Sequence, residues 1–170
     1  MPNRMDSMLS HGMARVKAVK ARLSGLVGVF KTLASEHGEV RVLLERAKTS
    51  DERFVDLWPT IRRELISHEK AERRELYPVL RAHPETRSLA DHHDAEADEL
   101  DALIASVDAL GVGTPELHDA FKLLIERVAH HSKEEESKIF PEAQRVIGKD
   151  RAELIETKFL AAKRQLSLMH

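Results

Sequence analysis

The chain has 170 residues, the length of one ordinary domain, and Ala, Leu, Glu, Lys and Arg make up about half of it. This bias, together with an aromatic content of only 4%, is typical of long helices and excludes an all-β domain rich in turns. The absence of cysteine excludes disulfides, thiolate metal sites and a cysteine nucleophile, and the net charge of −2 conceals a basic segment over residues 1–31.

The first predicted element is a basic amphipathic helix over residues 1–28. Its apolar residues recur at helical spacing and are Val16, Val19, Leu23 and Leu26. Gly25 and Gly28 mark a bend or break at its end. We expect this helix to cover the following bundle and to allow self-association. Aromatic residues do not alternate with its basic residues, so no nucleic-acid partner is expected.

The next part of the chain, residues 29–147, is predicted to form the main domain. Its apolar periodicity and turn residues predict four helices, over about 29–48, 51–81, 86–110 and 115–147. Pro59 predicts a kink or a separate short segment in the second helix. Thr114 is expected to cap the fourth, with Pro115 at its first position.

Residues 148–170 are predicted to form a last helix that packs on this domain. The expected fold is therefore all-α: an antiparallel up-down four-helix bundle with an additional helix at each end. No apolar run approaches the roughly 18 residues of a membrane span. Lys and Arg interrupt the N-terminal region where a signal peptide would be apolar, so we expect a cytoplasmic protein.

A His-x-x-x-Glu motif occurs on the second and on the fourth bundle helix. His68 and Glu72 form the first copy, and His131 and Glu135 form the second. A spacing of four residues places both side chains on one helix face. That face is otherwise apolar in both helices, so the four polar side chains are expected to point into the bundle, where charge is costly unless it is paired or bound to metal.

The two copies share a continuation that distinguishes them from chance matches. Tyr77-Pro78 follows His68 by nine and ten residues, and Phe140-Pro141 follows His131 by the same distances. His130 also has a Glu four residues later, but it is out of this register and lies about 100° around the helix from His131. The repetition favours His131 over His130.

Each motif is preceded by a helix that carries another histidine. His37 lies near the start of the first bundle helix, and His92 and His93 lie near the start of the third. The apolar residues after His93 recur on its own face, so His93 is the better inward candidate and His92 is the alternative. His37 and His68 are nearly equidistant from the turn between their helices, as are His93 and His131, so each pair can meet at one height in an antiparallel hairpin.

The chain is thus predicted to be an internal duplication of a helical hairpin. Closing two such hairpins into a bundle gathers four imidazoles and two carboxylates in its core. The six candidate metal ligands are His37, His68, Glu72, His93, His131 and Glu135. The competing interpretation is a polar network without metal, which is hard to satisfy with six buried ionisable groups. Imidazole and carboxylate without thiolate suit iron, manganese or zinc.

At these residues the sequence resembles the hemerythrin-like (HHE cation-binding) family over roughly residues 29–147. The resemblance rests on Glu36-His37, His68, Glu72, Tyr77-Pro78, His93, His131, Glu135 and Phe140-Pro141. It implies two non-haem iron ions with an oxo or hydroxo bridge, bridging carboxylates at Glu72 and Glu135, and the four histidines as terminal ligands. The respiratory hemerythrin pattern has a further histidine where this chain has Ala97, which leaves room for water or an exogenous ligand. Glu136 is an alternative to Glu135 at a different spacing.

The resemblance implies a protein that binds or turns over O2, NO or peroxide at this di-iron site. Two alternatives remain open. One is iron delivery in Fe–S cluster repair, and the other is an iron or oxygen sensor in which metal occupancy controls exposure of the basic helix. Reversible binding and turnover use the same ligands, so the sequence does not distinguish a carrier from an enzyme.

Overall fold

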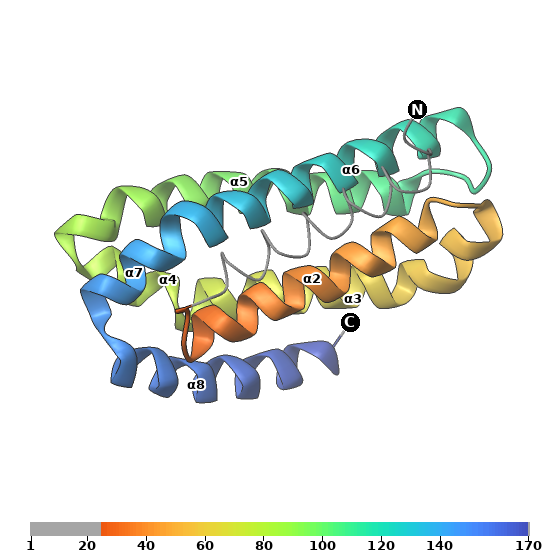
Figure 1. The fold of residues 1–170 in the computed structure, drawn as a ribbon. Coiled ribbons are helices and arrows are strands. Elements are labelled where there is room, and N and C mark those ends of the chain that lie inside the picture. Colours follow the sequence, from red (N-terminus) through yellow and green to blue (C-terminus); the bar gives the residue numbers. More distant parts are fainter. Residues whose placement is uncertain (1–24, 170) are drawn as a thin grey trace, which may run out of the picture.

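The computed structural model describes residues 25–169, and every regular element in that range is a helix (Figure 1). The elements are α2 (Val29–Ala47), α3 (Asp51–Glu75), α4 (Tyr77–Ala82), α5 (Pro84–Ala109), α6 (Pro115–Glu134), the π-helical segment η1 (Glu135–Ile139), α7 (Phe140–Ile147) and α8 (Lys149–Ser167). This confirms the all-α fold class. No helix in the described range is long and apolar enough to cross a membrane.

Four long helices form the bundle as two antiparallel hairpins, α2–α3 and α5–α6 (Figure 1). Each hairpin has a capped second helix. Ser50 accepts a hydrogen bond from the backbone N–H of Arg53 at the start of α3, and Thr114 accepts one from Leu117 at the start of α6, as predicted. These side chains satisfy helix N–H groups that have no partner within the helix.

Pro59 does not divide α3, which runs unbroken from Asp51 to Glu75, so the alternative of a separate first segment is wrong. A proline removes the N–H that would bond the carbonyl four residues earlier, here that of Val55. Val55 is exposed, so water can satisfy that carbonyl.

The predicted second helix ends earlier than expected, at Glu75, and the chain resumes as α4 after Leu76. The proline ring of Pro78 would clash with the carbonyl of Arg74 in a continuous α-helix. The break separates these groups, and the carbonyl of Leu76 accepts the N–H groups of Val79 and Leu80 to start α4.

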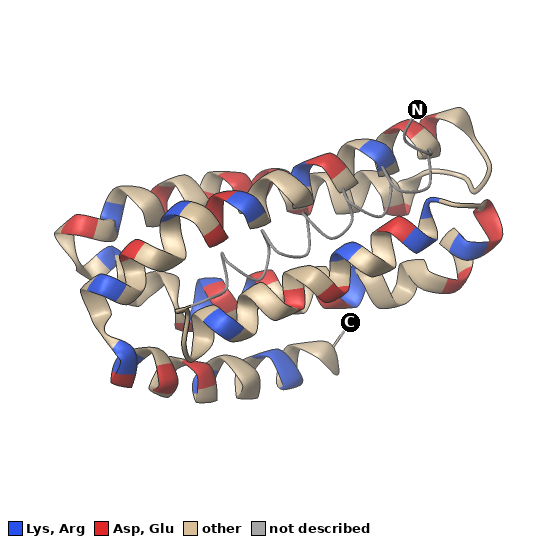
Figure 2. Ribbon diagram, in the orientation of Figure 1, with Lys and Arg blue, Asp and Glu red and all other residues tan. Residues whose placement is uncertain are grey.

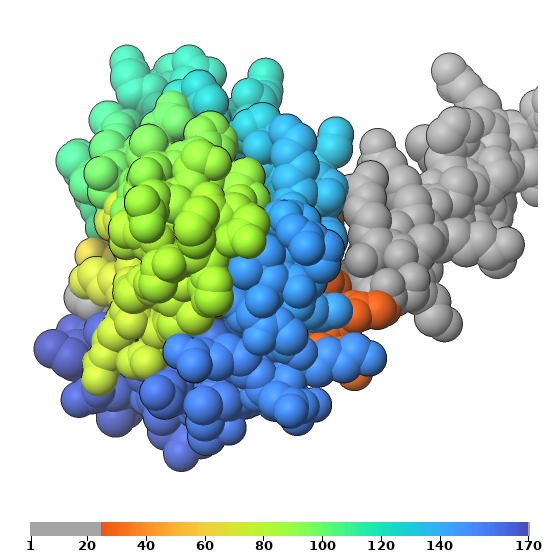
Figure 3. All heavy atoms as spheres, turned by 90° about the vertical axis from the view of Figure 1, so that its left-hand side faces the viewer, coloured from red at the N-terminus to blue at the C-terminus, as the bar shows by residue number. Residues whose placement is uncertain are grey.

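Two apolar cores lie at opposite ends of the bundle. The core near the α2–α3 and α5–α6 turns includes Phe54, Trp58 and Phe121, whose rings pack together. The core at the other end, where α4, α7 and α8 close the bundle, contains Phe30, Leu33, Leu76, Tyr77, Leu80, Phe140 and Phe159. Figure 3 shows this second end, with α7 and α8 in blue against the start of α5 in green. Side chains between the two cores are shielded from water on both sides.

The C-terminal helix α8 packs along α3 and α2 (Figure 1). Its start approaches the turn before α2 so closely that a Cβ on Gly28 would lie 2.5 Å from the backbone of Ala152. Gly28 also has a φ of +54°, which favours glycine. Residues 25–28 are not helical, so the expected N-terminal helix does not extend to residue 28; its other residues, 1–24, lie outside the described range.

Candidate metal centre

A cluster of seven ionisable side chains occupies the level between the two apolar cores. All four long helices and the π segment contribute to it, and every member is 8% exposed or less. The members are His37 from α2, His68, Glu69 and Glu72 from α3, His93 from α5, His131 from α6 and Glu135 from η1. These residue types are the oxygen and nitrogen ligands of non-thiolate metal sites.

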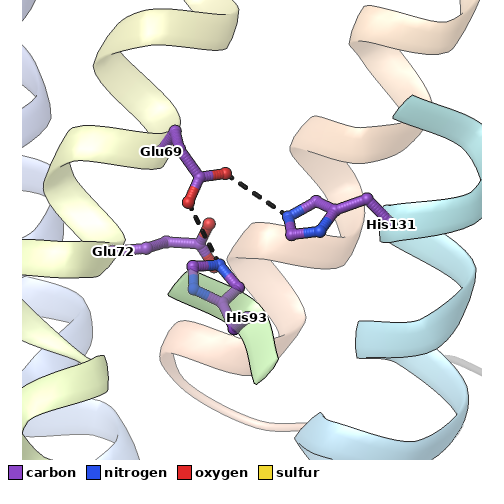
Figure 4. Close-up of side chains that lie close together, drawn as sticks. All are labelled: Glu69, Glu72, His93 and His131. Atoms are coloured by element: carbon purple, nitrogen blue, oxygen red, sulfur yellow. Dashed lines mark ion pairs between the residues drawn. The ribbon is translucent and has the colours of Figure 1, made fainter. Parts of the chain in front are cut away.

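One group of the cluster faces the second hairpin. Glu69 and Glu72 point across from α3 toward His93 and His131, as Figure 4 shows. The Oε1 atom of Glu69 lies 3.1 Å from Nε2 of His93, and its Oε2 atom lies 3.3 Å from Nε2 of His131. One ligand atom from each of the four residues lies within 4.8 Å of the other three. Four donors this close can share one ion.

The other group faces the first hairpin and consists of His37, His68 and Glu135. Nε2 of His37 lies 3.1 Å from Oε2 of Glu135, and Nε2 of His68 lies 3.3 Å from Oε2 of Glu72. Glu135 also approaches Nε2 of His93, at 3.4 Å. The carboxylates of Glu72 and Glu135 therefore reach the histidines of both groups, as bridging ligands would.

Three of the four histidines have a carboxylate on the far side of the ring. The Nδ1 atom of His37 donates to Glu136 at 3.0 Å. Equivalent bonds join His68 to Glu36 at 2.7 Å and His131 to Glu96 at 3.1 Å. A proton fixed on Nδ1 leaves Nε2 with its lone pair toward the cluster, which is the orientation that a metal ligand needs.

His93 is held by an aromatic ring instead. Its ring stacks on that of Tyr77 with centroids 3.4 Å apart, and it is fully buried. The hydroxyl of Tyr77 donates to Oε1 of Glu135 at 2.6 Å. Tyr77 thus fixes two members of the cluster, and burial beside Glu135 raises the pKa of its phenol well above the usual range.

The charges in the cluster change the pKa of its members in opposite directions. Burial lowers the pKa of His68, but the charge of Glu72 and the hydrogen bond to Glu36 outweigh burial and raise it to about 10. For Glu135, burial raises the pKa, but the charge of His131 and the contact with His37 lower it to about 2. Without metal, protons on the imidazoles therefore balance the carboxylates.

Even so, many polar atoms of the cluster have no hydrogen-bond partner. Nine buried side-chain nitrogen and oxygen atoms of these residues have no hydrogen-bond partner, and they include Nε2 of all four histidines and both oxygens of Glu72. Buried polar groups without partners are rare in folded proteins and point to an ion or water at the site. The donor set and its convergence fit metal ions.

The structure brings all six residues predicted as ligands into this cluster. It also distinguishes the neighbouring histidines: His93 is buried and His92 is exposed, while His131 is buried and His130 is exposed. His118, near the start of α6, is exposed and pairs with Asp51.

Sequence reasoning missed Glu69, which reaches His93 and His131 on the side of the site where water or an exogenous ligand was expected. Glu69 directly follows His68 and so lies about 100° around α3, which is typical of a solvent-facing position. The signal that could have found it is Ala97, which stands where a further histidine would supply a ligand. A ligand missing at residue 97 of α5 has to come from a facing helix, and Glu69 of α3 is in that place.

The π segment η1 was also not predicted. It starts at Glu135, and the N–H of Phe140 donates to the carbonyl of Glu135, five residues earlier. Pro141 lacks an N–H and would clash with the carbonyl of Ser137 in a regular helix, so the wider turn relieves it. At the start of this segment both Glu135 and Glu136 are buried, the first in the cluster and the second on His37.

Comparison with known proteins agrees with this site. Residues 28–143 match the family model of the hemerythrin HHE cation-binding domain. A DNA nickase from Nostoc sp. (strain PCC 7120) is 26% identical over an alignment 170 positions long, which covers 89% of this chain and 47% of that protein. The chain thus spans about half the length of this curated relative. No solved structure matches the chain. A match over most of the chain and a buried His/Glu cluster at its motifs place the protein in the hemerythrin HHE cation-binding family.

Proposed function

We propose that this protein holds two iron ions in its His/Glu cluster and uses them to bind or turn over O2, NO or peroxide. The observation that carries the proposal is the convergence of four Nε2 atoms and three carboxylates, most of them without a hydrogen-bond partner, in a buried site. When bound, a carboxylate-bridged iron pair would supply one-electron chemistry and an open position for a small ligand.

Charge balance supports two divalent ions rather than one. Glu69, Glu72 and Glu135 contribute three negative charges, and the four histidines are neutral as ligands. Two divalent cations supply four positive charges, which leaves one charge for a hydroxide or an exogenous anion. One divalent ion would leave a net negative charge buried, which is costly.

A small cavity beside the cluster supports a small ligand. Its volume is about 30 Å³, enough to hold a molecule of about the size of water. The polar part of its wall includes His37, His68, Glu69 and His131, and the apolar part consists of Val40, Leu65, Leu100, Ile104 and Val128. A diatomic molecule or peroxide fits this size, and the apolar wall limits access of bulk water.

The site does not favour the reaction named for the Nostoc relative. Cleaving DNA at a metal requires a phosphodiester to reach the ion, whereas the cluster is at most 8% exposed and its cavity is small. We expect the iron-loaded protein to leave a supercoiled plasmid intact. Conversion to the nicked form that is lost when Glu135 is replaced would favour nuclease activity at this site.

The experiment that tests the proposal is metal analysis followed by spectroscopy. We expect two iron ions per chain after anaerobic reconstitution with Fe(II). Exposure to O2, NO or peroxide should then change the visible spectrum, and a stable oxy band indicates binding, whereas rapid decay of peroxide indicates turnover. Stoichiometric zinc alone, or failure to take up Fe(II), would refute the proposal. Iron transfer to an apo-cluster acceptor would favour delivery.

A further inference from the structure

The C-terminal helix α8 lies outside the matched domain, yet one of its side chains is connected to the His/Glu cluster through one other residue, Glu36. Nζ of Lys163 lies 2.7 Å from Oε2 of Glu36 and 3.0 Å from Oε2 of Glu64. Its side chain is only 13% exposed, so water screens this contact weakly. The same Oε2 atom of Glu36 accepts the Nδ1–H of His68 at 2.7 Å.

This contact is held in place by the packing of α8. The ring of Phe159, one turn before Lys163, meets the ring of His68 edge-on with centroids 5.9 Å apart. Nearer the start of α8, Glu156 accepts a hydrogen bond from Thr32 of α2. The close approach of Ala152 to Gly28 fixes the first turn. Lys163 is therefore directed at Glu36 by a fixed helix.

The second hairpin has no equivalent of this arrangement on its histidine within the described range. The carboxylate that accepts from His131 is Glu96, and its other partners are His92 and His130, each 3.5 Å away and more than half exposed. Those histidines face solvent. In addition, Glu69 contributes a carboxylate to the His93 and His131 side. The two halves of the cluster thus differ in their contacts: one has the additional carboxylate of Glu69, and the other has Lys163 on the carboxylate behind its histidine.

A carboxylate behind a ligating imidazole makes that imidazole a stronger donor, because it draws the Nδ1 proton toward itself. A cation on the same carboxylate opposes this effect, because it attracts the carboxylate charge away from the Nδ1 proton. We propose that Lys163 is a positioning residue which, through Glu36, makes the metal position next to His37 and His68 the weaker of the two. The inference rests on the proposed function, in that it requires two metal positions.

Cobalt titration of the metal-free protein tests the proposal. Visible absorption with a competing chelator gives the two stepwise dissociation constants, and we expect them to be unequal in the wild type. In Lys163→Met the weaker constant should tighten about tenfold while the other stays unchanged. Lys163→Arg keeps the charge and should behave as the wild type. Lys158→Met removes an exposed lysine from the same helix and serves as the matched control.

The sign of the change separates a charge effect from a structural one. If Lys163 only supported the fold, its removal would loosen the site and weaken binding. Lys163→Gln should tighten the weaker constant as Lys163→Met does, and it keeps the test available if the methionine variant does not fold, as judged by circular dichroism.

A double variant tests whether the effect passes through Glu36. Glu36→Gln should weaken the same constant, and adding Lys163→Met to it should then change little, because the carboxylate is gone. Weakening in Lys163→Met, equal constants in the wild type, or a full effect of Lys163→Met in the Glu36→Gln background would each overturn the proposal. A wild-type protein that binds fewer than two cobalt ions would instead refute the proposed function.

Discussion

The two hairpins of the bundle carry the same motif but support it differently. In α2–α3 the helix stops soon after Glu72, and Tyr77 of the next helix crosses over to hold Glu135 and His93. In α5–α6 the chain continues through a π turn, and the corresponding aromatic residue, Phe140, stacks on His37 without a hydroxyl to donate. Tyr77 thus holds two ligands of the other hairpin by stacking and a hydrogen bond, whereas Phe140 holds His37 by stacking alone.

This difference shows what a duplication preserves. Repeating a hairpin repeats the ligand types and their height, because both depend on helical spacing alone. The environment of each ligand depends on what packs behind it, and here Glu69, Lys163 and the two aromatic residues differ between the halves. We infer that a symmetric ligand frame can hold two unequal metal positions.

The largest effect is expected where the two halves meet. Replacing Glu135 or Glu72 by Ala should remove most bound metal, because each carboxylate reaches both groups of the cluster. Glu136→Ala should weaken binding by about 10- to 100-fold without abolishing it, since it removes only the partner of His37. Metal content after desalting measures both. Equal retention in the Glu135 and Glu136 variants would contradict the bridging role.

Glu69→Gln should affect one half alone. Glu69 contacts His93 and His131, so we expect loss of one metal ion per chain and retention of the other. Glu52→Gln, an exposed change on the same helix, is the control. Loss of both ions would show that the halves are not independent.

The register of α5 predicts which of two adjacent histidines matters. His93→Ala should lose metal, whereas His92→Ala should keep it, because only His93 lies in the cluster. The same contrast is expected for His131 and His130 on α6. Iron content of the four variants checks both pairs, and retained iron in His93→Ala with loss in His92→Ala would reverse the assignment.

The metal-free protein should lose stability as pH rises. The pKa of His68 is raised from about 6.5 to about 10 in the folded state, so the protonated form favours folding. This contribution is fully present below about pH 6.5 and is lost as pH rises through about 10, by up to several kcal/mol. Urea unfolding across this range measures it. Removing the charge of Glu72 by Glu72→Gln should reduce the pH dependence, and an unchanged dependence would assign it to other groups.

The smallest effect is expected for Tyr77→Phe, which makes the first hairpin resemble the second at this position. The change removes the hydrogen bond to Glu135 and keeps the stacked ring. We expect the free energy of unfolding to fall by about 2 kcal/mol, the usual value for a bond to a charged group. Phe140→Leu removes a ring from the same core. It should lower the free energy of unfolding through lost packing alone, because Phe140 has no hydroxyl. An unchanged free energy of unfolding in Tyr77→Phe would show that the hydrogen bond to Glu135 does not stabilise the fold.

Much of the fold follows from the sequence because apolar spacing determines which side of each long helix is buried. The same spacing is enough to distinguish His93 from His92. It does not reveal Glu69, because a carboxylate next to a histidine normally faces solvent, and only the shape of the assembled cluster gives it a role. It also does not locate the break at Leu76 or the π turn, since Pro78 and Pro141 affect backbone hydrogen bonds, which the pattern of side chains does not encode.

The π turn at Glu135 also bears on how such sites are found by pattern searches. A regular helix directs adjacent residues about 100° apart, so two neighbouring carboxylates normally meet different groups. Here both Glu135 and Glu136 are buried beside the same histidine, His37. A count of four residues after His131 therefore finds Glu135 but misses Glu136, the carboxylate that holds His37.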